Sequence, residues 1–355
     1  MSENMLEKII KDAIESNASD IHLTKGLPPT LRIYKELIFQ DRKELTNSDI
    51  KNIVEKLLPN GAQSKYNQTK YIDSSFEYAS YRFRVHIYRQ SSSDAVTLRL
   101  IPTKIPLIEE LNIPTVLKQF TTLRNGLVLI TGITGSGKST TLAALIGEIN
   151  SNQKKHIITV EDPIEFVHKH KNSIITQKEI GNDVTSFAEA VRSAVREDPD
   201  VLLVGEMRDL ETIQNTITMA ETGHLVFATL HTRNVAETID RIIDVFQPSQ
   251  QQQIRMQLSS VIEGIVSQHL VPKIDGGIVP ACEVMIATDA IRNLIREQNP
   301  PNSILDQIQM NHKKLGSQTY IQSLATLYNK KLISYETAIQ NTDNGEELKK
   351  MIMSV

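Results

Sequence analysis

Cysteine is nearly absent from this chain of 355 residues. The single Cys282 cannot form an internal disulfide, which fits a reducing cytosol, and it excludes a zinc site built from four cysteines. Long apolar runs are also missing, since no stretch approaches the roughly 18–20 residues that span a membrane. Residues 1–11 contain acids and alternate polar with apolar side chains, unlike a secretory signal peptide. Any work at a membrane is therefore expected from its cytoplasmic side, through a partner.

An excess of basic residues is missing as well. The chain has 39 Lys and Arg against 42 Asp and Glu, a net charge of -3, which argues against bulk affinity for nucleic acid. Internal repeats and low-complexity tracts are absent, and the length fits two or three ordinary globular domains.

The chain does contain one complete phosphate-binding motif. Residues 132–139 read GITGSGKS and fit the pattern G-x-x-x-x-G-K-[ST] at every position. An apolar run at 126–130 precedes the motif, and a stretch of helix-forming residues, 139–149, follows it. The motif is thus expected on the strand–loop–helix turn that its chemistry requires. We predict that the chain binds a nucleoside triphosphate.

The residues of this motif have distinct expected roles. Its glycines let successive backbone N–H groups converge on phosphate oxygens, at a helix N-terminus whose dipole favours an anion. Lys138 is expected to reach the β- and γ-phosphates, and the Ser139 hydroxyl to hold Mg²⁺. The predicted ATP-binding set is Gly132, Thr134, Gly135, Ser136, Gly137, Lys138, Ser139 and Thr140.

Residues 1–100 are predicted to form a separate α+β domain, because amphipathic helical spacing and strand-like alternation both occur there. Residues 101–114 carry prolines among few regular signals, so they are expected to be a linker. The expected helices lie at 6–14 and 48–58, the strands at 20–23, 30–33, 76–88 and 95–100, and a hairpin loop at 91–94.

From residue 115 to 280 the pattern changes to alternating strands and helices. Apolar runs at 126–130, 156–160, 201–204 and 225–230 are separated by helical stretches, which predicts a parallel sheet covered on both faces. After Pro280 we expect the strands to stop. Residues 281–355 are predicted to form a mostly helical subdomain, with helices at 290–296, 320–327 and 335–339.

Carboxylates follow two of the predicted core strands. Strand 156–160 leads into Glu161 and Asp162, and strand 201–204 leads into Glu206. Ligands of open parallel sheets bind outside the carboxyl ends of the strands, so these acids should converge on the phosphates. Glu161, Glu206 and Lys138 are the predicted catalytic residues, with Ser139 and Glu206 as metal residues. The sequence leaves open which carboxylate activates water and which serves the metal, and Glu161 could merely cap the following segment.

Two histidines flank the predicted strand 225–230. His231 follows the strand at the phosphate end and is expected to act as a sensor of the γ-phosphate or of a subunit interface, and in catalysis. His224 precedes the strand and is a second sensor candidate. Either side chain could instead be an ordinary core histidine, and zinc is disfavoured because the two are too far apart to share an ion.

Several arginines are candidates for fingers that neutralise charge on the γ-phosphate from a neighbouring subunit. Arg82 and Arg84 share one face of a predicted strand because side chains alternate with a period of two. The alternative is an ordinary solvated surface, in which Arg192, for example, pairs with Glu189. The full candidate set is Arg82, Arg84, Arg99, Arg192, Arg196 and Arg241.

Four blocks stand in order: GITGSGKST at 132–140, ITVEDPIEF at 158–166, DPDVLLVGEMRD at 198–209 and TGHLVFATLHT at 222–232. Together they resemble the Walker A, Asp box, atypical Walker B and His box of the secretion and pilus ATPase superfamily. One departure is Gly205, which stands where many P-loop ATPases carry an aspartate before the glutamate. The absence of a tetracysteine insert and the segment AIRNLIRE at 290–297 make the chain similar to the PilT family of pilus retraction ATPases.

This resemblance implies a PAS-like N-terminal α+β domain, a RecA-like P-loop core with a parallel central sheet, and a C-terminal helical subdomain. It also implies Mg²⁺-dependent ATP hydrolysis by a homohexamer that drives pilus retraction and twitching motility. The expected partner is an inner-membrane platform protein, and the expected location is the cytoplasmic face of the membrane, with no nucleic acid bound. Three alternatives remain open: a pilus assembly or type II secretion ATPase of the same superfamily, a nucleic-acid motor, and a nucleotide-gated scaffold that does not hydrolyse ATP.

Overall fold

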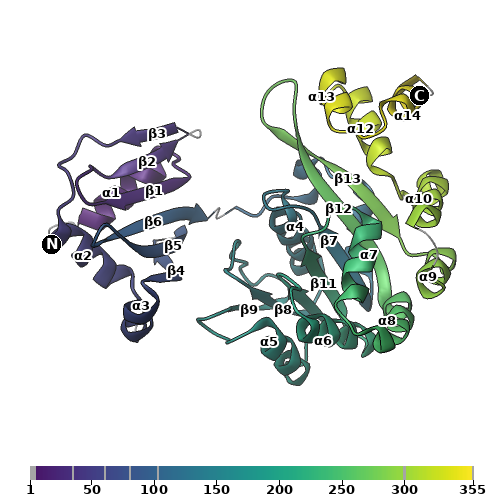
Figure 1. Ribbon diagram of the computed structural model, residues 1–355, viewed down its shortest axis with the longest axis horizontal. Coiled ribbons are helices and arrows are strands. Elements are labelled where there is room, and N and C mark those ends of the chain that lie inside the picture. Colours follow the sequence, from purple (N-terminus) through teal and green to yellow (C-terminus); the bar gives the residue numbers. More distant parts are fainter. Residues whose placement is uncertain are drawn as a thin grey trace. The chain divides into compact units, whose positions relative to one another are not determined.

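The computed structural model describes residues 5–33, 36–59, 61–79, 81–101, 104–298 and 301–353. Contacts divide the chain into two compact units. The N-terminal unit comprises Met1–Lys104 with Glu165–Val167, and the core unit comprises Ile105–Ile164 with His168–Val355 (Figure 1). Each unit has its own hydrophobic core, so each is described by itself.

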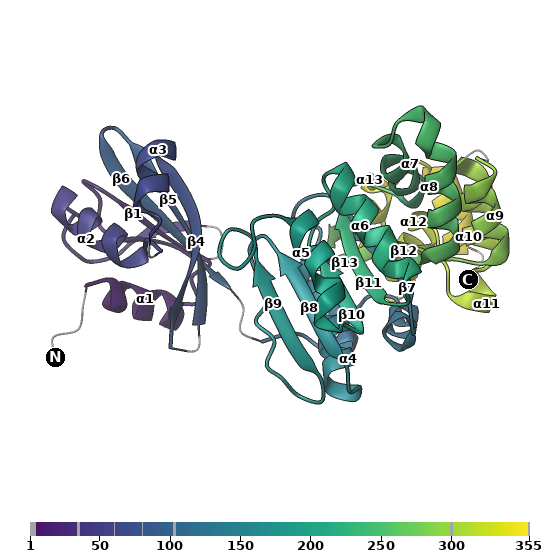
Figure 2. The ribbon, with the colours of Figure 1, turned by 90° about the horizontal axis from the view of Figure 1, so that it is seen from below.

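The N-terminal unit is an antiparallel sheet of order β3-β2-β1-β6-β5-β4 with helices on one face (Figure 2). Leu6 and Ile9 from the first helix and Ile50 from the second pack against Phe83 and Val85 of the sheet. The elements are α1 (Met5–Glu15), β1 (Asp20–Thr24), β2 (Thr30–Ile33), β3 (Glu36–Phe39), α2 (Asn47–Leu57), α3 (Gln63–Thr69), β4 (Tyr71–Tyr78), β5 (Tyr81–Gln90) and β6 (Ser93–Ile101).

Three details of this unit differ from the sequence-based expectations. The strand β3 was not predicted, and the stretch expected as one strand at 76–88 is divided between β4 and β5. The hairpin loop expected at 91–94 is a tighter turn, because Ser93 already pairs with Gln90 in the β5–β6 ladder. Ser91 and Ser92 make this turn with φ values of 44° and 60°.

The core unit is built on a sheet of order β13-β12-β7-β11-β10-β8-β9, in which the neighbours from β12 to β9 run parallel. Its strands are β7 (Gly126–Thr131), β8 (His156–Glu161), β9 (Ile174–Glu179), β10 (Val201–Val204), β11 (Leu225–Leu230), β12 (Ile262–Pro272) and β13 (Ile278–Ile286). β13 pairs antiparallel with β12 at one edge.

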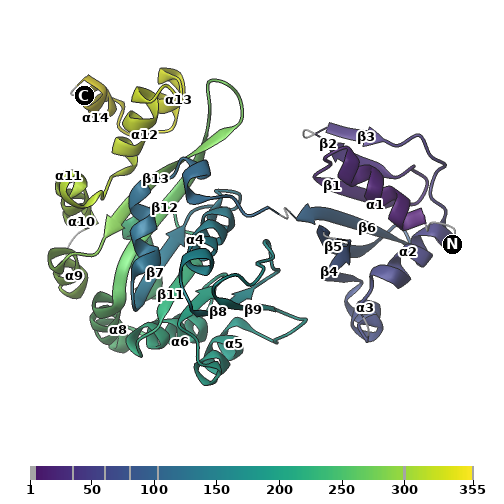
Figure 3. The same ribbon diagram turned by 180° about the vertical axis from the view of Figure 1, so that it is seen from behind.

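Helices cover both faces of this sheet, which explains the continuous apolar strands. Leu127 and Leu129 of β7 belong to the core on one face, and the alternate residues Val128 and Ile130 belong to the core on the other. Helix α7 lies in front of the sheet in Figure 1, and α4 lies in front in Figure 3. The helices of the core fold are η1 (Ile108–Leu111), η2 (Thr115–Thr122), α4 (Lys138–Asn152), α5 (Phe187–Ala194), η3 (Val195–Glu197), α6 (Leu210–Glu221), α7 (Val235–Asp244) and α8 (Pro248–Val261).

The expectation that strands stop at Pro280 is wrong. Pro280 lies inside β13, which continues to Ile286, and its partner β12 was not predicted. Helices then follow: α9 (Asp289–Arg296), α10 (Pro301–Met310), α11 (His312–Leu315), α12 (Tyr320–Asn329), α13 (Tyr335–Gln340) and α14 (Gly345–Met353). Leu324 and Ile333 from this part pack against Val271 and Val279 of the β12–β13 hairpin.

Part of the segment 101–114, which was expected to be a linker, is regular and packed structure. Residues 102 and 103 lie outside the described residues, but η1 occupies its middle, and Ile108 and Ile113 are buried in the core unit. The segment from Ile105 onward is therefore a packed part of the core unit.

Candidate nucleotide-binding site

The phosphate-binding motif lies on the expected turn between β7 and α4. Gly137 stands at the N-cap of α4 with φ 88°, in the left-handed region that side-chain-bearing residues avoid. At Gly132 a Cβ atom would lie 2.3 Å from the carbonyl oxygen of Gln268, so only glycine fits there. The loop 132–137 thus takes its shape both from its own glycines and from a close neighbour in β12.

Lys138 is the first residue of α4 and its side chain is almost fully buried. Its Nζ donates hydrogen bonds to the carbonyl oxygens of Gly132 at 2.8 Å and Ile133 at 3.1 Å. These bonds hold the ammonium group within the curve of the loop. The Ser136 hydroxyl is also buried and has no hydrogen-bond partner among the residues that the structure describes, so the loop presents a cation and a hydroxyl where anionic oxygens would bind.

Glu206 and His231 lie together at the carboxyl edge of the sheet. The Glu206 carboxylate is 3.2 Å from His231 Nε2 and 2.6 Å from Arg208 Nε. Their loops are tied to each other, since Met207 N donates to the Thr229 carbonyl at 3.0 Å. The two residues were predicted from separate strands, and the structure brings them into contact.

Arg208 lowers the pKa of the Glu206 carboxyl. Burial raises the pKa of the Glu206 carboxyl, but the hydrogen bond from Arg208 and the nearby His231 and Arg208 charges outweigh it, so the pKa lies below its usual value. The pKa of Arg208 is raised in turn by its bond to Glu206, with Asp162 adding to the effect. Glu206 is therefore an anion at neutral pH. Arg208 was not singled out from the sequence.

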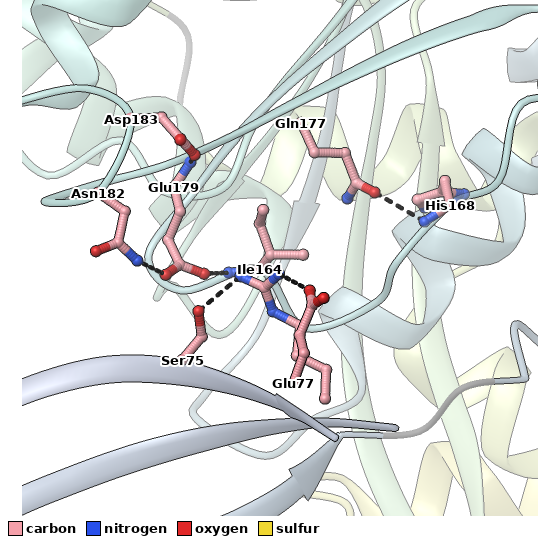
Figure 4. Close-up of polar contacts among 9 residues, drawn as sticks. Ser75, Glu77, Ile164, His168, Gln177, Glu179, Asn182 and Asp183 are labelled. Atoms are coloured by element: carbon pink, nitrogen blue, oxygen red, sulfur yellow. Dashed lines mark hydrogen bonds and ion pairs between the residues drawn. The ribbon is translucent and has the colours of Figure 1, made fainter. Parts of the chain in front are cut away.

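Glu161 ends β8 beside β10, because Val160 pairs with Val204. Its Oε1 accepts hydrogen bonds from the Thr159 hydroxyl at 2.7 Å and from Gln177 Nε2 at 3.3 Å. Gln177 Oε1 in turn accepts from His168 N at 2.7 Å (Figure 4). The carboxylate is thus oriented by groups on β8 and β9.

The loop after β8 is held by a second carboxylate, which the sequence analysis did not single out. Glu179 is 2% exposed and accepts from Ile164 N at 3.1 Å and from the side chain of Asn182 (Figure 4). It fixes the backbone of the Asp box two residues beyond Asp162. Its role in the described contacts is structural.

The candidate His224 is not brought to the phosphate loop of its own chain. It precedes β11 at the edge where β7 begins, and Gly126 N donates to its carbonyl at 3.0 Å. Its ring bonds Met219 O and Thr222 Oγ1 locally. The length of strand β11 separates it from His231 at the carboxyl edge, so a sensor role for His224 at a subunit interface stays a prediction.

The arginines of the N-terminal unit fall into two groups. Arg84 and Arg99 are cross-strand partners on β5 and β6, and both line a cavity of about 430 Å³ on the sheet. Arg99 Nε also donates to the buried Asp20 at 2.8 Å. Arg82 instead bonds Glu77 Oε1 and Ser75 Oγ, each at 3.0 Å.

The other arginine candidates, Arg192, Arg196 and Arg241, lie exposed on the core unit. Arg192 forms an ion pair with Glu211 at 3.4 Å. The pairing with Glu189 considered from the sequence is not the one that the structure has. Helix α5, which carries Arg192, ends at Ala194, and the following Val195 is 52% exposed. In this chain alone none of the three is placed at the phosphate loop by a described contact.

Polar residues of β12, none of them singled out from the sequence, contact the end of β7 and the loops of the site. Ser267 bonds Thr131 Oγ1 at 2.7 Å, and Gln268 Nε2 donates to Ser136 O at 2.7 Å. His269 Nε2 lies 2.9 Å from Arg233 O, two residues beyond His231. β12 itself was not predicted, so no signal pointed to these side chains.

Comparison with known proteins identifies the family. Residues 1–326 match the family described as Type II/IV secretion system protein. The chain is 43% identical over 334 residues to the type IV pilus retraction ATPase PilT of Pseudomonas aeruginosa, covering 94% of this chain and 96% of that protein. It is also 43% identical to a twitching motility protein of Neisseria gonorrhoeae, covering 90% of this chain and 86% of that protein.

A crystal structure of the pilus retraction motor PilT with bound ADP superposes with a TM-score of 0.90, at 45% identity, covering 98% of this chain and all of that one. The chain belongs to the secretion and pilus ATPase family. The sequence-based recognition of this family, the mixed α/β fold class and the assignment as a nucleotide-binding ATPase are thereby confirmed.

The described residues were also searched for membrane-spanning helices and for clusters of metal-binding side chains. No helix in the part of the chain that the structure describes is long and apolar enough to cross a bilayer. Across the same residues, His, Cys, Asp and Glu side chains do not gather in groups of three or more that could hold a metal ion by themselves.

Proposed function

We propose that this ATPase is a homohexameric motor that uses MgATP to drive retraction of type IV pili from the cytoplasmic face of the inner membrane. The observation that carries the proposal is the phosphate loop on β7 and α4, with Glu206 and His231 at the same sheet edge, in a chain 43% identical to a pilus retraction ATPase. An inner-membrane platform protein is the proposed partner, since the described chain holds no membrane-spanning helix of its own.

The site residues divide the work of phosphoryl transfer. The backbone amides of residues 132–140, which include Thr134 and Thr140, would bind the β- and γ-phosphates. Lys138 would neutralise the charge of these phosphates. Ser139 and the anionic Glu206 are the residues that would hold Mg²⁺, whose charge would stabilise the transferring phosphoryl group. Glu161, held by Thr159 and Gln177, would orient the attacking water.

Arginines from a neighbouring subunit would complete the site. Arg84 and Arg99 are the best placed for this role, because they are paired side by side in a cavity on an open sheet face. Arg82 bonds Glu77 and Ser75, and Arg99 also bonds the buried Asp20, so the preference for Arg84 and Arg99 rests on their place in the cavity. Closure of the N-terminal unit on the core on ATP binding, with reopening after hydrolysis, would be the step that performs work.

Hydrolysis is tested by phosphate release from the purified protein. Lys138→Ala and Glu206→Gln are each expected to lower kcat by about a hundredfold or more, the usual effect of removing a preorganised electrostatic group. Arg42→Gln, which removes an ion pair with Asp12 in the N-terminal unit, is the control and should retain activity. Full activity in both site variants would refute the proposed roles.

Completion of the site in trans is tested by mixing inactive subunits. Arg99→Ala subunits keep the phosphate loop, and Lys138→Ala subunits keep the arginine, so a mixed ring contains some complete sites. Recovery of hydrolysis on mixing supports an arginine acting across the interface. Inactive mixtures that still assemble into hexamers would argue against it.

Retraction itself is tested in the host. Deletion of the gene should increase surface pili and abolish twitching, and the wild-type gene, but not Lys138→Ala, should restore both. Loss of surface pili on deletion would instead identify an assembly ATPase.

A further inference from the structure

The strongest unassigned feature is Gln268, a buried amide side chain of β12 lying against the phosphate loop. The side chain is 1% exposed and belongs to a strand that the function described above does not use. Its Nε2 donates to the carbonyl oxygen of Ser136 at 2.7 Å, and its Oε1 accepts from the Thr141 hydroxyl of α4 at 2.9 Å. Both ends of the amide are therefore committed, which fixes its orientation.

Gln268 also limits the space on two sides of the loop. A Cβ atom at Gly132 would lie 2.3 Å from the backbone oxygen of Gln268, and one at Gly137 would lie 2.7 Å from its Nε2. The first and the last glycine of the loop, Gly132 and Gly137, thus both lie directly against Gln268. The loop cannot change shape at either end without moving against β12.

The bond to Ser136 O has a geometric consequence for phosphate binding. The Ser136 carbonyl and the Gly137 N–H belong to one peptide unit, which is planar and trans, so they point in opposite directions. Holding the carbonyl toward Gln268 turns the Gly137 N–H away from β12. Backbone N–H groups of such a loop are the donors that hold the phosphates.

We propose that Gln268 is a positioning residue that aims the Gly137 amide at the bound phosphates. It acts through the peptide unit of Ser136 and Gly137 and does not itself touch the nucleotide. The proposal rests on nucleotide binding at the phosphate loop, as set out above. Because such an amide contacts phosphate in the ground state and the transition state alike, its loss should weaken binding more than it slows turnover.

The test compares Gln268→Met with wild type and with Ser267→Ala. Methionine is of similar length and lacks the donor, whereas Ser267→Ala removes a buried hydrogen bond from the same strand that does not reach residues 132–137. The Kd for a fluorescent ADP analogue is measured by titration, and kcat and KM for ATP by phosphate release. Melting without nucleotide shows whether each variant folds.

We expect Gln268→Met to raise the Kd for the ADP analogue and the KM for ATP about tenfold, the equivalent of one lost interaction of 1.4 kcal/mol, with kcat changed less. Ser267→Ala should keep both constants near the wild-type values while lowering the melting temperature. Equal Kd values for Gln268→Met and wild type would overturn the proposal. A wild-type protein that binds no ADP would instead overturn the proposed function.

Gln268→Glu provides a second readout that a purely structural role would not move. It keeps the volume of the side chain and the acceptor for Thr141, but an ionised carboxylate cannot donate to Ser136 O. The Kd ratio of this variant to wild type should therefore be large at pH 8 and become smaller at pH 6, as the carboxyl regains a proton and a donor. A ratio that stays at one at both pH values contradicts the positioning role.

Discussion

The buried Glu283 makes the stability of the core unit depend on pH. It lies on β13 with 3% of its surface exposed, and its Oε2 accepts one described hydrogen bond, from Val235 N at 2.9 Å. Burial raises its pKa to about 7 from an ordinary value of 4.5, although the Val235 bond acts in the opposite direction. The folded protein therefore binds this proton more tightly than the unfolded chain does.

The sign of the effect follows from this difference. Between pH 4.5 and pH 7 the folded state holds the proton and the unfolded state has lost it, so the free energy of unfolding falls as pH rises. The stabilisation is complete below the unfolded pKa and is lost as pH rises through the folded pKa. A shift of this size corresponds to about 3 kcal/mol in total, of which about 2.5 is lost between pH 5 and pH 8.

Glu283→Gln removes the titration and keeps an acceptor for Val235 N. Melting temperatures of the variant and wild type are compared at pH 5, 6, 7 and 8, with Glu44→Gln, an exposed carboxyl in the N-terminal unit, as the control. Relative to wild type, Glu283→Gln should gain several degrees from pH 5 to pH 8, since 1 kcal/mol moves the melting point by about 2–4 °C at this size. Melting curves of wild type and Glu283→Gln that shift in parallel across this range would refute the reasoning.

Two further predictions concern the site and the core. Arg208→Gln should raise the pKa of Glu206, so the acidic limb of the kcat profile should move to higher pH, whereas Arg42→Gln should leave it in place; an unmoved limb would show that ionised Glu206 is not required. Gly264→Ala should destabilise the core unit by about 1–3 kcal/mol, because the new Cβ would lie 2.3 Å from the Phe120 ring. Denaturant unfolding measures this loss, and unchanged stability would mean that the ring moves aside freely.

The phosphate loop could be predicted because its signals are local. The glycines, Lys138 and Ser139 are consecutive, and the strand and helix that frame them carry their own apolar patterns. The carboxylates could be placed by one additional rule, since parallel strands bring their carboxyl ends to one edge. The contact between Glu206 and His231 follows from that rule, but the pairing with Arg208 depends on the path of a loop and could not be predicted.

The helix at 290–296 shows where an amphipathic pattern misleads. An amphipathic helix over these residues would bury Ile291 and Ile295 and expose Arg292. Ile291 and Ile295 are buried, but the Arg292 side chain is only 17% exposed. Its guanidinium donates to the carbonyls of Ser259 and Ser260 at the end of α8 and pairs with Glu263 at 2.6 Å. A half-buried arginine whose guanidinium lies at the C-terminus of another helix is stabilised by the carbonyls of that helix, and periodicity cannot reveal such a contact.

β12 escaped prediction for a related physical reason. It begins directly where α8 ends, at Ile262, so no turn separates the two elements. Its consecutive residues Ser267, Gln268 and His269 are polar, although Ser267 and Gln268 are fully buried. Such a run does not resemble an apolar core strand or an alternating surface strand.

The polar side chains of β12 are required because the phosphate loop lies beside this strand. Ser267 pairs in register with Thr131, the last residue of β7, so the next positions of β12 run alongside a loop that has left the sheet. The loop presents carbonyls such as that of Ser136, which have no strand partner, and a buried carbonyl without a hydrogen bond is costly. An apolar side chain at Gln268 would leave the Ser136 carbonyl without this partner. The same geometry that frees the loop amides for phosphate therefore demands a polar residue on the neighbouring strand, and that demand is what hides the strand from the sequence pattern.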